Sequence, residues 1–275
     1  IYYCSFQLKE VEMVFLAVLF AERADFLLRK SKIQWKALLL LLLIPAYMFM
    51  IRTALAATLV LALLCALLFT SGRVVSIGRR IALSTLAGIA AIVMLFSTTS
   101  IGEDVAQMWQ TGGSTQQGNM EWRSQRSAKM SQSFAKYAGA AVFAPLIFTI
   151  PFPSMVYTFQ EQEMQMQAHG GYFIKNVLSF FVIFVMFYFL KTKEWRRHLV
   201  PIAFTCGYLV ALVMSVFAQS GRFHLLIIPF EMMFAAYGIT LMNKKRMKWF
   251  QYALIFECVV CIAWSWFKLA GRGMI

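Results

Sequence analysis

The stretch SGRFHLLIIPFEMMFAAYG occupies residues 220–238 and is apolar over most of its length. It carries Arg222 and His224 near its start and Glu231 in its interior. An apolar run of about 20 residues is the length that a helix needs to cross the hydrocarbon core of a membrane. Ionisable side chains in such a run are costly and usually mark a functional site. The stretch therefore predicts a membrane-spanning helix with a polar entrance.

The rest of the sequence has the same character. Of the 275 residues, 60% are hydrophobic and 14% are charged, whereas soluble domains carry about 25% charged residues. Apolar segments recur along the chain, so we predict an all-α, polytopic helical membrane protein that folds as a single membrane domain over residues 1–275. The segments cover residues 11–21, 37–51, 53–71, 81–97, 137–157, 172–190, 199–219, 223–242 and 249–267. The first residue is Ile1 and we find no signal-peptide pattern after it, so we expect the sequence to be an N-terminally truncated fragment.

Short clusters of Lys and Arg lie between the apolar segments and contribute to the net charge of +14. The positive-inside rule places such clusters on the cytoplasmic side of the membrane. We therefore expect this charge to set the topology and to contact membrane lipids, and we expect no nucleic-acid partner. The clusters fall within residues 23–36, 73–80, 191–197 and 244–248.

The positions of these clusters limit the number of crossings. Three apolar segments, 81–97, 137–157 and 172–190, separate the second cluster from the third. Three crossings would put those clusters on opposite sides of the membrane, so one segment should not cross. The segment 137–157 contains three prolines, which break a regular helix. We predict that it is re-entrant or interfacial, and that the chain has about eight transmembrane helices.

On this topology residues 98–171 form an outer-side loop and interfacial region. Arg123 and Arg126 belong to a basic stripe there, which favours an amphipathic helix on anionic lipid or a guide for an anionic substrate. Arg52, between two apolar segments, lies on the same side. Its planar guanidinium suits the phosphate of a lipid or of a phosphorylated substrate.

Glu231 follows His224 by seven residues, so on one continuous helix the two would share a face about 10 Å apart in depth. Arg222, His224 and Glu231 would then line a path from the outer surface into the bundle. Alternatively, the first two reach lipid headgroups and Glu231 pairs with a neighbouring helix. Glu10 is a further candidate base, or simply part of a helix start. We expect Glu231 and Glu257 to be the only clear deep charges.

Other chemistries lack their signatures. The sequence has no P-loop, no G-x-G-x-x-G, no G-x-S-x-G and no D-x-D. Cys258 and Cys261 form a C-x-x-C inside an apolar segment, without a second pair or a histidine partner, which favours small buried side chains. No carboxylate and histidine set has the spacing of metal ligands. We expect neither a cofactor nor a divalent metal.

Several of these stretches resemble one group of proteins. IRTALAATLVLALLCALLFTSGR, residues 51–73, resembles the arginine-led span of oligosaccharide repeat-unit polymerases and O-antigen ligases. SGRFHLLIIPFEMMFAAYG resembles the R-(F/Y)-x-x-x-x-x-P span of polytopic GT-C glycosyltransferases and related exopolysaccharide polymerases. FQLKEVEMVFLAVLF, residues 6–20, is similar to a Lys-Glu-led span in bacterial members, and WSWFKLAGRG, residues 264–273, to Bacteroidetes envelope proteins of this kind.

The resemblance implies a GT-C-like fold in the bacterial inner membrane, multi-pass, with its active face on the periplasmic side. Its members transfer a sugar or glycan from an undecaprenyl phosphate or pyrophosphate carrier, so the implied partner is a lipid-linked glycan. The implied activity is that of a membrane glycosyltransferase or polymerase in envelope polysaccharide assembly. The candidate phosphate-binding residues are Arg52, Arg222, Arg123 and Arg126, and the candidate catalytic residues are His224, Glu231 and Glu10.

Two other functions remain open. A flippase or transporter of lipid-linked glycan would share the outer arginines, but it should also place basic or polar residues in the bundle at mid-depth. A non-catalytic scaffold subunit would use the same arginines only for contact with lipids.

Overall fold

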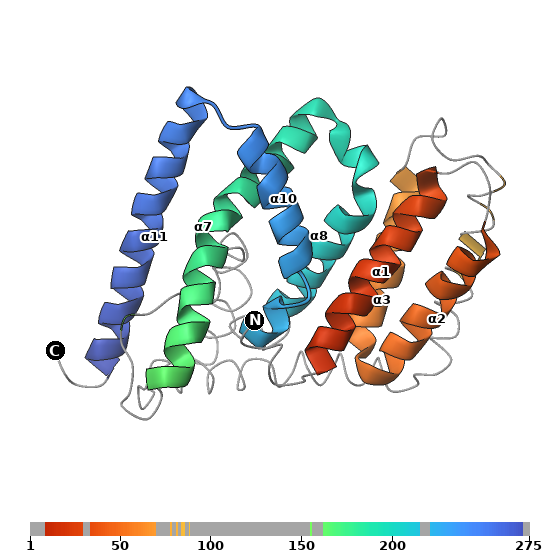
Figure 1. Ribbon diagram of the computed structural model, residues 1–275, viewed down its shortest axis with the longest axis horizontal. Helices are drawn as coiled ribbons and strands as arrows, with labels where there is room; N and C mark the ends of the chain where they lie inside the picture. The colour runs from red at the N-terminus through yellow and green to blue at the C-terminus, as the bar shows by residue number, and fades with distance from the viewer. Residues whose placement is uncertain are drawn as a thin grey trace.

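The regular structure of the described part of the chain consists of helices in a computed structural model (Figure 1). The structure describes residues 9–29, 34–69, 162–214 and 221–271, together with positions 78, 81, 84, 85, 88 and 155. Within these residues there is no strand, so the all-α prediction is confirmed. The helices are α1 (Lys9–Arg29), α2 (Trp35–Ile51), α3 (Thr53–Phe69), α7 (Gln162–Thr192), the 3₁₀ turn η4 (Glu194–Arg197), α8 (Leu199–Met214), α9 (Gly221–His224), α10 (Ile228–Thr240) and α11 (Lys244–Gly271).

Two of these helices are long and apolar enough to cross a membrane. They are Gly171–Thr192, within α7, and Lys244–Trp266, within α11. Both expose large apolar side chains, such as Phe187 on α7 and Ile255 on α11. Such surfaces suit lipid better than water, so the structure supports association with a membrane. The count of about eight crossings stays a prediction.

The turn between α2 and α3 is a single residue, Arg52. Its backbone is extended, with φ −159° and ψ 98°. The Arg52 N–H donates to the Met48 carbonyl at 2.7 Å, and the Arg52 carbonyl accepts from Leu55 and Ala56 at 3.1 and 3.2 Å. Arg52 therefore closes the end of α2 and the start of α3 with its backbone groups. It is also the arginine that separates the two apolar segments in the sequence.

Helix α10 packs closely and in parallel against α7. Lys175 of α7 lies beside Glu231 of α10, and farther along both helices Phe181 lies beside Gly238. A Cβ atom at Gly238 would be 2.8 Å from the Phe181 carbonyl oxygen and 2.9 Å from a methyl group of Val185. Glycine thus lets the two backbones approach more closely than any other residue would allow.

Helix α11 covers the other side of α7 in the antiparallel direction. The rings of Phe250 and Phe181 are 4.8 Å apart, and nearer the C-terminus of α11 the Asn176 side chain is hydrogen-bonded to Glu257. Helices α1 and α3 pack beside α8, with α3 in extensive contact with it, and α2 packs on the outer side of α1 and α3 (Figure 1). Their core is built from apolar side chains, including the fully buried Met13 and Phe204.

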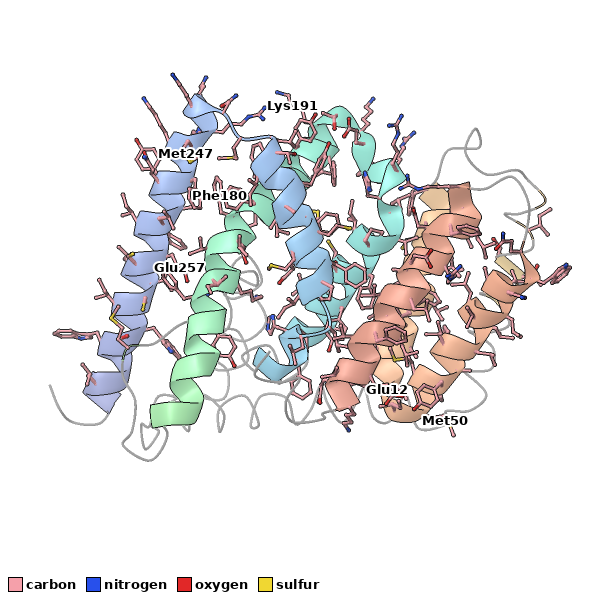
Figure 2. The ribbon with its side chains drawn as sticks, viewed as in Figure 1. Glu12, Met50, Phe180, Lys191, Met247 and Glu257 are labelled. Atoms are coloured by element: carbon pink, nitrogen blue, oxygen red, sulfur yellow. The ribbon has the colours of Figure 1, made fainter. Side chains whose placement is uncertain are left out.

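The described basic clusters gather at one end of the bundle. Lys191 and Met247 lie at this end, while Glu12 and Met50 lie at the opposite end (Figure 2). The C-terminus of α1 also reaches it, because Arg29 donates a hydrogen bond to the Arg197 carbonyl at 3.1 Å. We call it the basic end and the other the Arg52 end. This grouping is what the positive-inside rule requires of clusters 23–36, 191–197 and 244–248 if they share one side of a membrane.

The sequence predicted one continuous helix over the apolar segment 223–242, but the structure divides this segment into two helices. Helix α9 ends at His224, residues 225–227 form a turn, and α10 begins at Ile228. Pro229 explains the break, because proline cannot donate to the carbonyl four residues earlier, that of Leu225, and its ring crowds that turn. The predicted re-entrant segment 137–157 lies outside the described residues apart from Met155, as does most of the outer loop 98–171.

Candidate functional site

Two polar stretches that lie far apart in the sequence meet at the Arg52 end. The guanidinium carbon of Arg52 is 4.1 Å from the centroid of the Phe223 ring. The α2–α3 turn therefore contacts α9, the segment that also carries Arg222 and His224. A cation that is stacked on an aromatic face keeps its full charge, because the ring supplies no negative ion. Arg52 is thus held in place without being neutralised by Phe223.

Helices α1 and α8 complete this end with two buried polar side chains. Glu10 of α1 and Tyr208 of α8 are each 1% exposed. The Tyr208 hydroxyl lies within electrostatic range of both Arg52 and Glu10. A carboxylate from α1 and a guanidinium from the α2–α3 turn therefore lie close to the same tyrosine. We call Glu10, Arg52, Tyr208 and Phe223 the Arg52 cluster.

His224 follows Phe223 directly and is 1% exposed. Its backbone carbonyl accepts a hydrogen bond from the Ile227 N–H at 3.1 Å, which closes the turn between α9 and α10. His224 therefore belongs to the interior of the bundle rather than to the lipid headgroups. Glu12 behaves differently from Glu10: it is exposed and accepts a hydrogen bond from the Tyr47 hydroxyl at 2.7 Å.

A second polar group lies deeper, among α7, α10 and α11. Lys175 Nζ is 3.9 Å from Glu231 Oε1, and the two residues are 4% and 1% exposed. Beside them the Asn176 side chain is hydrogen-bonded to Glu257, which is 3% exposed. Glu257 also lies within electrostatic range of Lys175, and Figure 2 shows it near the middle of α11. We call these four residues the interior cluster.

Lys175 was not predicted from the sequence, so the expectation that Glu231 and Glu257 are the only clear deep charges was wrong. The signal was present as the Lys-Asn pair in FIKNVLSFFVIF, residues 173–184. The prediction that His224 and Glu231 share one helix face is wrong, because they belong to the separate helices α9 and α10. The contact that the structure gives Glu231 is with Lys175, which corresponds to the alternative of pairing between helices.

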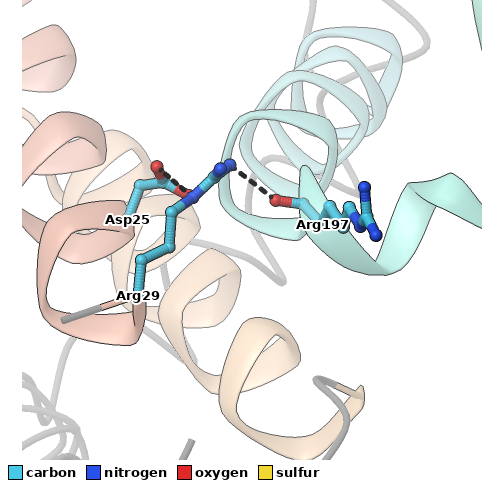
Figure 3. Close-up of polar contacts among 3 residues, drawn as sticks. All are labelled: Asp25, Arg29 and Arg197. Carbon is cyan, nitrogen blue, oxygen red and sulfur yellow. Dashed lines mark hydrogen bonds and ion pairs between the residues drawn. The ribbon is translucent and has the colours of Figure 1, made fainter. Parts of the chain in front are cut away.

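The basic end holds a cavity of about 210 Å³ between α1 and the start of α8. Arg29 Nε lies 2.7 Å from Asp25 Oδ2, and Arg29 Nη2 donates to the Arg197 carbonyl at 3.1 Å (Figure 3). Burial lowers the pKa of the neighbouring His198, and the positive charge of Arg29 lowers it further. Since Arg29 already binds Asp25 and Arg197, we do not assign the candidate site to this end.

The other predicted residues are placed as follows. The side chain of Arg222 and the whole of Arg123 and Arg126 lie outside the described residues. Cys258 is exposed and Cys261 is buried, and both are free thiols. Among the described residues no group of three or more His, Cys, Asp or Glu side chains is arranged to hold a metal ion.

No known family, curated protein or solved structure matches this chain.

Proposed function

We propose that the protein is a membrane glycosyltransferase or polymerase that uses an undecaprenyl phosphate- or pyrophosphate-linked sugar or glycan in envelope polysaccharide assembly. The observation that carries the proposal is the contact of Arg52 with Phe223 at the end of the bundle opposite the basic clusters. In this proposal the chain crosses the bacterial inner membrane about eight times, segment 137–157 is re-entrant or interfacial, and the Arg52 end faces the periplasm.

The chemistry of glycan transfer fits the residue types at the Arg52 end. When the anomeric carbon leaves a phosphate, negative charge develops on the leaving oxygen. A guanidinium that is fixed in a partly dry site stabilises this charge, and it can bind phosphate through two parallel hydrogen bonds. Arg52 would fill this role, with Arg222 as the second phosphate contact and Arg123 and Arg126 as weaker candidates.

The acceptor hydroxyl needs a positioned proton acceptor. His224 is adjacent to Phe223, which contacts Arg52, so it is our first candidate for the base. A histidine titrates close to neutral pH and is suited to this task. Glu10 is the second candidate, because it is buried at the same end. Glu231 is the least favoured of the three, since it lies 3.9 Å from Lys175.

The interior cluster favours a second function, transport or flipping of a lipid-linked glycan. Such a protein was expected to place basic or polar residues inside the bundle at mid-depth. Lys175, Asn176, Glu231 and Glu257 are buried side chains of this kind, from three helices.

The lipid-linked glycan pool of cells that carry Arg52→Ala, at matched protein level, separates these functions. Losing one fixed stabiliser of the developing charge should slow transfer by about 10²–10³-fold. Arg52→Lys keeps the charge but not the two-pronged geometry, and should fall between. Arg29→Ala at the basic end is the matched control and should leave the pool unchanged.

Each outcome of this experiment has one meaning. Accumulation of carrier-linked glycan on the outer leaflet, together with loss of polymer, supports the transferase. Accumulation on the inner leaflet favours the flippase. An unchanged pool and unchanged polymer would contradict both and leave the scaffold subunit.

A further inference from the structure

The charges of the interior cluster do not balance. Glu231 and Glu257 are both carboxylates when ionised, and among the described residues Lys175 supplies the one positive charge within electrostatic range of them. All three residues are at least 96% buried, with exposed fractions of 1%, 3% and 4%. If all were ionised, one negative charge would remain uncompensated inside the bundle. Such a charge is very unfavourable in a medium of low dielectric constant, and the group becomes neutral instead.

The described residues around the cluster offer no second positive charge. Asn176, on α7, is neutral and is hydrogen-bonded to Glu257. On α11 the titratable neighbours of Glu257 are the thiols Cys258 and Cys261. Helix α8 also packs against α10, and its Tyr208 lies close to Arg52 and Glu10 rather than to Glu231. Within the described residues, the groups that face the cluster are therefore neutral.

The geometry indicates which carboxyl becomes neutral. Glu231 lies 3.9 Å from the Lys175 ammonium, which favours its ionised form. Among the described residues, both carboxyl oxygens of Glu231 and Oε1 of Glu257 lack a hydrogen-bond partner, and the other part of the Glu257 carboxyl is hydrogen-bonded to the Asn176 amide. The ion pair with Lys175 is therefore what distinguishes Glu231 from Glu257. A carboxylic acid that carries a proton on a free oxygen fits the position of Glu257. A metal cation fits it poorly, because the nearby ammonium would repel it.

We infer that the interior cluster is a proton-binding site, in which Glu257 holds one proton while Lys175 and Glu231 form an ion pair. The site joins α7, α10 and α11, so gain or loss of this proton changes the charge at the contact between three helices. A proton held at mid-depth is also the coupling ion that a secondary transporter would use. The inference does not depend on whether glycan is transferred or flipped.

Infrared spectroscopy of the purified full chain in lipid nanodiscs tests this site directly, because a protonated carboxyl has a C=O stretch that is distinct from that of a carboxylate. At neutral pH the wild-type protein should show the C=O band of a protonated carboxyl, the acid band. In the Glu257→Gln variant this band should lose the intensity that one carboxyl contributes. Glu10→Gln is the control for the other buried carboxyl and should leave that intensity intact.

Substitutions of Lys175 and Glu231 test the inference further. Lys175→Met removes the positive charge, so Glu231 should also become protonated and the acid band should gain a second carboxyl. Glu231→Gln frees Lys175 to pair with Glu257, so the band should lose the share of Glu257. The inference is overturned if Glu257→Gln leaves the band unchanged, or if the band disappears when Na⁺ is added at constant pH, which would identify a metal-cation site.

Discussion

The two ends of the bundle both carry arginines, but they hold them differently. At the basic end the Arg29 side chain is 52% exposed and pairs with Asp25. At the opposite end Arg52 is partly buried over Phe223, while Glu10 and His224 are almost completely buried. Exposed ion pairs cost little and stabilise little, so they suit a topology signal. Buried polar groups are costly, so their presence at the Arg52 end favours a function there.

The largest expected difference in the free energy of unfolding is between substitutions of a buried lysine and of an exposed lysine on α7. Lys175→Met leaves Glu231 without its ion pair, and at pH 7 neutralising a carboxyl with an ordinary pKa of about 4.3 costs about 3.7 kcal/mol. Lys191→Met, at the exposed end of α7, should change the free energy of unfolding by less than about 0.5 kcal/mol. Denaturant unfolding in detergent measures both, and equal losses would contradict the distinction between buried and exposed charge.

The next comparison uses two glutamates on α1. Glu10→Ala removes a buried carboxylate close to Arg52 and Tyr208, and should destabilise the protein by about 1–3 kcal/mol. Glu22→Ala removes an exposed carboxylate that pairs with Arg23 at 2.9 Å, and should cost at most about 1 kcal/mol. Thermal unfolding of the two variants gives the difference. A larger loss for Glu22→Ala would show that the Arg52 end does not depend on Glu10.

The smallest effect concerns His198 at the basic end. Burial and the charge of Arg29 lower its pKa in the folded protein, so below about pH 6.5 the unfolded chain binds a proton more readily than the folded one. The contribution of neutral His198 to the free energy of unfolding is therefore present above this pH. It is lost as the pH falls through the pKa of His198 in the folded protein. Stability curves between pH 5 and pH 8 should be flatter for His198→Gln than for wild type; parallel curves would rule out this role for His198.

The sequence predicted the helices well because the length of an apolar segment can be seen in the local sequence. Segments 37–51 and 53–71 correspond to α2 and α3, and 172–190 lies within α7. The break at residues 225–227 could also have been predicted, since Pro229 supplies the reason. Proline alone is not decisive, however, because Pro45 lies inside the continuous α2.

The pairing of the polar residues could not be predicted in the same way. Lys175 and Glu231 come together because α7 and α10 run in parallel and Gly238 lets their backbones approach closely, which is a property of packing. Arg52 and Phe223 meet because a one-residue turn and α9 reach the same end of the bundle. Hydropathy and spacing indicate that such residues are unusual, but they do not identify their partners.

Side-specific labelling tests most directly whether the two ends face opposite sides of a membrane. Glu12→Cys at the Arg52 end and Lys245→Cys at the basic end, in a chain whose native cysteines are replaced, place one exposed thiol at each end. With a membrane-impermeant maleimide on intact cells, we predict that Glu12→Cys is labelled and that Lys245→Cys is labelled only after the membrane is opened. Labelling of both thiols from outside, or of Lys245→Cys alone, would contradict an outward-facing Arg52 cluster.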